Sequence, residues 1–254
     1  MKRNRAALIF GLIVLAVFAV AALFPTVLAP YGPTEMDAPW QKPSAQHLLG
    51  TNDLGYDLLT EMIYAARPTM LVGLAAAVFS LCLGTLIGLA AGALPGWKGE
   101  IASGVIQVFL MIPMFPAAIV VGAYCGGTLV SVIGIIAALG WCATARTVRA
   151  RTVQLMQSEF AEGFRVLGFS RARIVLRHVL PNALGPIIIM LAGSVSGTIL
   201  GAASYSFMGF GVQQPTPEWG AIISASRQFM RLSPTYAIIP GMAIVITAMS
   251  INLV

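Results

Sequence analysis

The amino-acid sequence predicts an all-α, polytopic membrane protein with about six transmembrane helices. Hydrophobic residues make up 58% of the 254 residues, charged residues only 9%, and the mean hydropathy is +0.87. This composition leaves too little polar surface to cover a water-soluble protein of that length. Apolar stretches of about 20 residues, enough for a helix to cross a hydrocarbon core about 30 Å thick, recur along the chain. Because these stretches are continuous rather than alternating, they exclude a transmembrane β-barrel.

Residues 1–29 are predicted to form an N-terminal transmembrane helix. An apolar run that ends at Pro25 follows three basic residues, Lys2, Arg3 and Arg5. A cleaved signal peptide is the alternative interpretation. The run is longer than the roughly 7 to 15 apolar residues of a signal peptide, and no clear small-residue cleavage site follows it, so an uncleaved helix is favoured.

Residues 30–68 are predicted to be an external segment, because a membrane core would not accept their acidic residues, Glu35, Asp37, Asp53, Asp57 and Glu61. Residues 69–254 then form a core domain with five further transmembrane helices. The first of these helices is expected over residues 69–94. The second, over 101–124, is expected to kink at Pro113 and Pro116. The last three are expected over residues 128–145, 182–208 and 237–254.

The distribution of basic residues predicts the orientation of the chain. With the N-terminus in the cytoplasm, the inner segments hold eleven Lys and Arg residues and the outer segments four, as the positive-inside rule requires. Both termini are then cytoplasmic, in a multi-pass protein of the cell (inner) membrane. The formal net charge of +6 follows this topology and does not indicate a nucleic-acid partner.

The energy for any transport is predicted to come from outside this chain. Within the second to sixth expected spans there is no Asp, Glu, Lys, Arg or His, the groups that an ion-coupled transporter normally places in the membrane. The sequence also lacks a GxxxxGK[ST] phosphate loop. We therefore expect a separate ATPase subunit, which would bind ATP and Mg, and no cofactor on this chain. A stand-alone channel or secondary transporter is the alternative.

The sequence predicts neither a catalytic site nor a metal site. Its three cysteines lie in or beside apolar stretches, with no CxxC pair and no His at ligand spacing. A membrane-embedded enzyme would need acids, His or Cys converging at one depth. The nearest candidates, His47 with Asp53 and Asp57, are interpreted as the solvated face of an external loop. We therefore expect a non-catalytic transport subunit.

Residues 146–180, which are rich in arginine, are predicted to form a cytoplasmic loop that docks on the ATPase. Their apolar residues follow two amphipathic helices separated at Gly168. The first helix is expected to begin at Ser158 and the second to end at Pro181. The residues expected to mediate coupling are Glu159, Ala161, Glu162, Gly163, Gly168, Arg171 and Pro181. A basic amphipathic helix lying on anionic lipid is the alternative.

Two sets of glycines recur at a spacing of four residues and so share one helix face each. The sets are Gly84, Gly88 and Gly92, and Gly193, Gly197 and Gly201. Each predicts either tight packing within the chain or an interface with a partner helix. The residues expected to line a translocation pathway are Gln107, Pro113, Pro116, Gly193, Gly197 and Gly201.

Three motifs, taken together, resemble a known transporter family. The segment Glu159–Asn182, EFAEGFRVLGFSRARIVLRHVLPN, resembles the cytoplasmic "EAA" loop of binding-protein-dependent ABC importer permeases. The segments HLLGTNDLGYDLLTEMIYAARPTMLVGL (47–74) and SFMGFGVQQPTPEWGAII (206–223) resemble the C-type subunit of the dipeptide, oligopeptide and nickel importers. Phe164 departs from the family pattern, which usually has Ala there, and is expected to alter the fit with the ATPase. The family's usual polar tail after Leu253 is absent, so we expect the given sequence to be shortened.

The resemblance implies a type I ABC importer permease fold. It also implies a heterodimer with a B-type permease, two ATPase subunits, and an external substrate-binding protein. Peptides, nickel or metal chelates, or similar small solutes are the implied cargo. The residues implied to face the binding protein are Gly50, Asp53, Asp57, Gln213 and Trp219.

Overall fold

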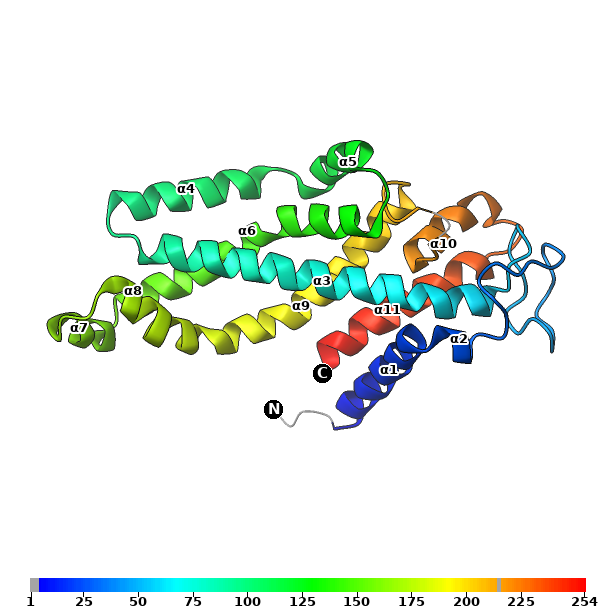
Figure 1. The fold of residues 1–254 in the computed structure, drawn as a ribbon, viewed down its shortest axis with the longest axis horizontal. Helices are drawn as coiled ribbons and strands as arrows, with labels where there is room; N and C mark the ends of the chain where they lie inside the picture. Colours follow the sequence, from blue (N-terminus) through cyan, green and yellow to red (C-terminus); the bar gives the residue numbers. More distant parts are fainter. Residues whose placement is uncertain (1–4, 214–215) are drawn as a thin grey trace. The chain divides into compact units, whose positions relative to one another are not determined.

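The computed structural model describes residues 5–213 and 216–254, so Lys2 and Arg3 lie outside the described residues. Helices dominate the described chain, which confirms the predicted all-α class (Figure 1). The described residues contain no β-strand. Two isolated bridges, Met36 with Tyr56 and Thr51 with Asp57, occur in the segment between α2 and α3.

Five helices of the described chain are long and apolar enough to cross a membrane, or six if one bent pair counts as a single span. This agrees with the predicted number. Four of them are α1 (Arg5–Leu23), α3 (Leu58–Ala93), α6 (Leu129–Met156) and α11 (Thr235–Leu253). The fifth, Gly185–Phe207, is the larger part of α9 (Leu180–Phe207). The shorter elements are α2 (Pro25–Leu28), α4 (Trp97–Met111), α5 (Met114–Cys125), α7 (Glu159–Val166), α8 (Arg171–Ile174), the π-helix η1 (Val175–Val179), α10 (Trp219–Ser226) and the 3₁₀-helix η2 (Arg227–Phe229).

The predicted span over residues 101–124 is broken rather than kinked. Its two halves, α4 and α5, meet at 76°. Pro113 explains the break, because proline disfavours a helical conformation in the preceding residue, and Ile112 is extended with φ −67° and ψ 120°. Pro116 lies in the first turn of α5, where a missing backbone N–H costs little.

Two helices extend past their expected ends. α3 begins at Leu58, where Asp57 Oδ1 accepts a hydrogen bond from the N–H of Thr60 at 2.7 Å and caps the helix. Its 36 residues correspond to roughly 54 Å, which exceeds the thickness of a hydrocarbon core. α6 continues to Met156, eleven residues beyond its expected end. Charged residues expected in loops therefore extend these helices.

The expectation that Pro181 ends a helix is wrong. α8 passes through η1 into α9 without a break, and Pro181 lies in the first turn of α9. Proline has no N–H to donate, and its ring would clash with the carbonyl four residues earlier. The five-residue π-helix directly before it widens the turn, and the Leu180 N–H bonds instead to Val175 O.

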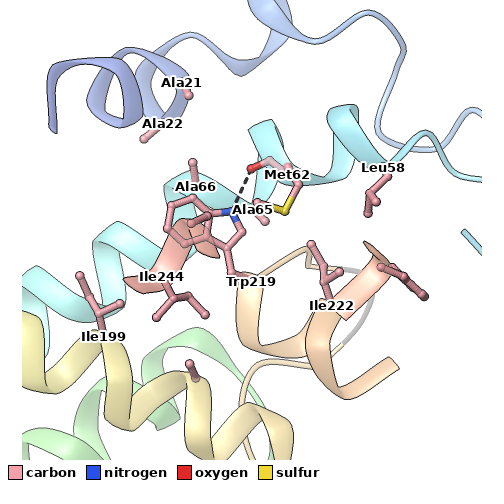
Figure 2. Close-up of a cluster of buried hydrophobic side chains, with 13 residues drawn as sticks. Ala21, Ala22, Leu58, Met62, Ala65, Ala66, Ile199, Trp219, Ile222 and Ile244 are labelled. Atoms are coloured by element: carbon pink, nitrogen blue, oxygen red, sulfur yellow. Dashed lines mark hydrogen bonds between the residues drawn. The ribbon is translucent and has the colours of Figure 1, made fainter. Parts of the chain in front are cut away.

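The chain forms two compact units. One comprises the chain up to Ala75 with Val121–Ile133 and Val195–Val254. In its core, Trp219 lies among Ala65, Ala66 and Ile244 (Figure 2). The other unit comprises Ala76–Val120 and Gly134–Ser194, and its core includes Leu89, Val148, Ile174 and Val179.

Candidate functional site

The helix α7 begins where the sequence predicts, with Ser158 in the extended conformation of an N-cap at φ −77° and ψ 155°. Its hydroxyl donates to Leu155 O at 2.6 Å instead of capping the helix. Glu159 and Glu162 occupy the first turn and are exposed. Their negative charges favour the helix start because the N-terminal end of the helix dipole is positive.

Gly168 ends α7 in the left-handed conformation, at φ +80°. The N–H of Phe169 donates to Phe164 O and that of Gly168 to Arg165 O, both at 3.0 Å. These two bonds form a Schellman motif, and the rings of Phe164 and Phe169 make its apolar contact at 5.3 Å. The predicted separation of the two amphipathic pieces at Gly168 is confirmed.

One face of α7 packs inside its own unit. Ala161, one of the expected coupling residues, is fully buried, so its side chain offers no surface to a partner. Phe164 is half-buried and stacks on the ring of His178, with centroids 3.9 Å apart. The expectation that Phe164 alters an outward fit is therefore corrected, because its ring anchors α7 to the π-helix.

The opposite face of α7 is open. A Cβ added to Gly163 would meet no atom within 4 Å, and Val166 and Leu167 are 84% and 72% exposed. Exposed apolar side chains of this size beside Glu159 and Glu162 form a surface without a partner among the described residues. We call these five residues the α7 surface.

The other two expected coupling residues, Arg171 and Pro181, lie on α8 and α9. Arg171 is exposed and donates from Nη1 to the carbonyl oxygen of Ala93, the last residue of α3, at 3.2 Å. Pro181 is exposed at the start of α9. Both belong to the same unit as α7.

The glycines of α3 pack tightly against α6. A Cβ on Gly84, Gly88 or Gly92 would lie 2.5 to 2.7 Å from atoms of Thr144, Trp141, Ala145 or Thr152. Side chains have no room at such distances. This set is therefore tight packing within the chain, one of the two predicted alternatives.

The glycines of α9 are open. A Cβ on Gly193, Gly197 or Gly201 would meet nothing within 4 Å. Gln107, Pro113 and Pro116 are likewise exposed. These six residues remain available to a partner or a solute, but they lie on different elements and no described cavity brings them together.

The motif around Trp219 is buried and belongs to the core of its unit. Trp219 is fully buried, and its Nε1–H donates to Met62 O at 3.0 Å (Figure 2). Glu218 caps α10 by accepting from the N–H groups of Gly220 and Ala221, each at 3.0 Å. The indole ring is thus unavailable for the direct binding-protein contact that the resemblance implied.

His47 and two aspartates form a network in the segment before α3. His47 is 3% exposed, with Nδ1 3.0 Å from Asp57 Oδ2 and Nε2 3.3 Å from Asp37 Oδ2. The hydrogen bond to Asp57 is the main cause that raises the pKa of His47. The interpretation of His47 and Asp57 as a solvated face is wrong, because folding of the segment brings Asp37 and Asp57 to opposite nitrogens of one ring.

Three further residues of this segment and the later loop were implied to face the binding protein. Gly50 is buried at φ +82°, and its absent side chain leaves room for Gln41 O. Asp53 is half-buried and accepts from the hydroxyl of Tyr236 at 3.2 Å. Gln213 is exposed, although its side chain bonds to Gly209 O. Gln213 is therefore accessible and Asp53 is partly accessible, whereas Gly50 is not.

Long apolar helices joined by charged segments define a polytopic α-helical membrane protein. Residues 84–254 match the family described as binding-protein-dependent transport system inner membrane component, and residues 1–49 match the N-terminal transmembrane domain of oligopeptide transport permease C. The chain belongs to this family of transport system inner membrane components, which confirms the resemblance seen in the sequence.

Characterised relatives give the same assignment. The dipeptide transport system permease protein DppC of Alkalihalophilus pseudofirmus is 34% identical over 256 residues, covering 100% of this chain and 84% of the relative. A di/tripeptide permease of Pseudomonas aeruginosa is 34% identical over 96% and 83% of the two chains. The glutathione permease GsiD of Pectobacterium atrosepticum is 33% identical over 99% and 84%. The chain is a non-catalytic, multi-pass permease subunit of an inner-membrane ABC importer.

Proposed function

We propose that this chain forms half of a translocation pathway for short peptides and couples it to an ATPase through residues 159–182. The relatives named above are permeases for dipeptides, di- and tripeptides and glutathione, which supports a peptide cargo. The partners in this proposal are a B-type permease, two ATPase subunits that bind ATP and Mg, and an external substrate-binding protein.

The α7 surface carries the coupling part of the proposal. Its acids and exposed apolar residues face outward, while Ala161 and Phe164 fix the helix to its own unit. A helix that is anchored on one face and open on the other can transmit the movement of a docked subunit. Arg171 and Pro181 are exposed in the same unit and, in this proposal, extend the contact.

The open glycine face of α9 supports the pathway part. Gly193 and Gly197 leave the helix backbone accessible, which lets a second helix or a solute approach closely. The broken α4–α5 segment, with Gln107, Pro113 and Pro116 exposed, offers irregular backbone of the kind that membrane proteins place beside aqueous cavities. We assign these two elements to the wall of the pathway.

In this proposal both termini and α7 lie on the cytoplasmic side. The arginines in and around α7 then follow the positive-inside rule. The external segment and the loop that carries Gln213 lie on the other side, toward the binding protein. Cysteines introduced at Arg173 and at Gln213 are expected to react with an impermeant reagent from opposite sides, and same-side labelling would overturn this orientation.

Replacing Gly168 with valine tests the coupling. A left-handed conformation costs a β-branched residue about 1 to 2 kcal/mol, which weakens the native turn by a factor of about 5 to 30. We expect Gly168→Val to lower ATPase activity stimulated by the loaded binding protein, and to reduce co-purification of the ATPase subunits. The permease pair should remain in the membrane.

Gly126→Val is the matched control, because Gly126 also has a positive φ of +73° and open space around its Cβ position, but lies far from α7 in sequence. Normal coupling in Gly168→Val, or equal loss in both variants, would contradict the role of α7. Transport by this chain reconstituted alone would instead indicate a channel or secondary transporter. Competition between a labelled dipeptide and nickel ions in the assembled importer distinguishes the two cargo classes.

A further inference from the structure

A cavity of about 370 Å³ lies within the second unit, between the end of α3, the start of α4 and the last turns of α6. Three arginines line it: Arg149 from α6, Arg165 from α7 and Arg171 from α8. Glu100 is the single acid among its described lining residues, and its side chain is 83% exposed. The lining therefore carries an excess of two positive charges, three minus one.

Each of the three arginines has N–H groups beyond those that donate the hydrogen bonds given below. Arg149 donates from Nη2 to Gly99 O at 3.0 Å and lies 3.9 Å from Glu100 Oε1, at the limit of an ion pair. Its Nε is buried and has no hydrogen-bond partner among the described residues. Arg171 uses Nη1 on Ala93 O, and Arg165 uses Nη2 on Met156 O. A guanidinium has five N–H donors, so most of the donors around the cavity are unassigned.

The start of α4 adds a further attraction for anions. This 15-residue helix follows Gly96, and its first turn lines the cavity through Gly99 and Glu100, whose N–H groups donate to Gly96 O. The positive end of the helix dipole therefore lies at this cavity edge. Trp97 is 68% exposed, and Lys98 lies over its ring at 5.9 Å. An exposed Trp beside Lys is typical of the membrane–water boundary, where lipid phosphates lie.

A purely structural role, in which these arginines bind the last carbonyl groups of α3 and α6, uses only one nitrogen of Arg171 and one of Arg165. It leaves their remaining N–H donors and the unpartnered Nε of Arg149 unexplained. Planar guanidinium groups bind phosphate through pairs of parallel hydrogen bonds, which three converging arginines can supply.

We propose that this arginine cavity binds a phosphate group, contributed by an anionic lipid headgroup or by free phosphate. The shared chemistry is a phosphate oxyanion held by Arg149, Arg165 and Arg171 at the start of α4. This proposal concerns ligand binding by the second unit and does not rest on the coupling role of α7.

The test uses the purified importer complex in nanodiscs of phosphatidylcholine with a minor fraction of phosphatidylglycerol. We expect phosphatidylglycerol to be enriched among the lipids retained by the complex in native mass spectrometry. Arg149→Gln should weaken this retention about fivefold, the effect of one basic residue at an anionic surface. Arg146→Gln is the control, because Arg146 is an exposed arginine of the same helix that does not line the cavity.

A second measurement needs no variant and decides the source of the phosphate. Lipid binding predicts that phosphatidylglycerol raises the thermal unfolding midpoint of the wild-type complex, whereas inorganic phosphate does not. Binding of free phosphate predicts that inorganic phosphate raises the midpoint more than sulfate or chloride at matched ionic strength. If neither phosphatidylglycerol nor phosphate stabilises the complex, or Arg146→Gln lowers retention as much as Arg149→Gln, the proposal is overturned.

Discussion

The two glycine sets of this protein share a spacing of four residues but differ in whether another helix packs against them. On α3, a Cβ at Gly84, Gly88 or Gly92 would overlap α6, whereas on α9 a Cβ at Gly193, Gly197 or Gly201 would meet nothing. The spacing thus determines that glycines share a helix face. It does not determine whether that face is filled by the same chain, because the answer depends on which helix folds back against it.

The same contrast separates the motifs that identify the family. Trp219 belongs to the motif of residues 206–223 and is buried in the core of one unit. Val166 and Leu167 belong to the motif of residues 159–182 and are exposed. Family motifs therefore comprise two kinds of residue, some that build the fold and some that remain open, and substitutions distinguish the two kinds.

The largest effect is expected at the buried motif. Trp219→Ala removes a fully buried ring and its hydrogen bond to Met62 O, and should lower the free energy of unfolding by about 3 to 5 kcal/mol. Thermal unfolding in detergent measures this loss. Trp97→Ala, at a 68% exposed tryptophan, should change it by less than about 0.5 kcal/mol. Similar losses in both variants would contradict the assignment of Trp219 to the core.

The glycine sets are compared directly by one substitution in each. Gly88→Leu places atoms within 2.7 to 3.0 Å of α6 and should destabilise the chain by about 1 to 3 kcal/mol, because the helices must move apart. Gly197→Leu meets open space and should leave the thermal midpoint of the isolated chain unchanged. On our assignment of α9 to the pathway wall, it should reduce transport. A stability loss in Gly197→Leu equal to that in Gly88→Leu would remove the contrast.

A smaller, pH-dependent effect is expected in the segment before α3, around His47. Bonding to Asp57 raises the pKa of His47 above its ordinary 6.5, so its stabilising contribution is fully present below that pH. The contribution is lost as the pH rises through the folded-state pKa. Asp37 has a lowered pKa, caused first by the Ala38 N–H, and stays ionised throughout this window.

Thermal midpoints measured from slightly acidic to alkaline pH check this expectation. The wild-type midpoint should fall with rising pH, and the slope should diminish in His47→Gln. An unchanged slope in that variant would show that another group causes the pH dependence.

Much of the helical architecture is predictable from the sequence, because a membrane span leaves a long apolar run. The break at Gly168 is also predictable, since glycine favours the positive φ that ends α7. The end of α6 is not, because its last turns are polar and basic, which hydropathy alone assigns to a loop. The burial of Ala161 and Trp219 and the stacking of Phe164 on His178 depend on contacts distant in sequence, which no local pattern encodes.

The stacking of Phe164 on His178 has a mechanical consequence. His178 lies within η1, and η1 continues into α9 without an intervening loop, so α7 and the long helix share a stiff joint. On the proposed coupling role of α7, a flexible linker at this point would absorb the displacement of a docked subunit. With the ring stack in place, a push on α7 would instead turn the base of α9.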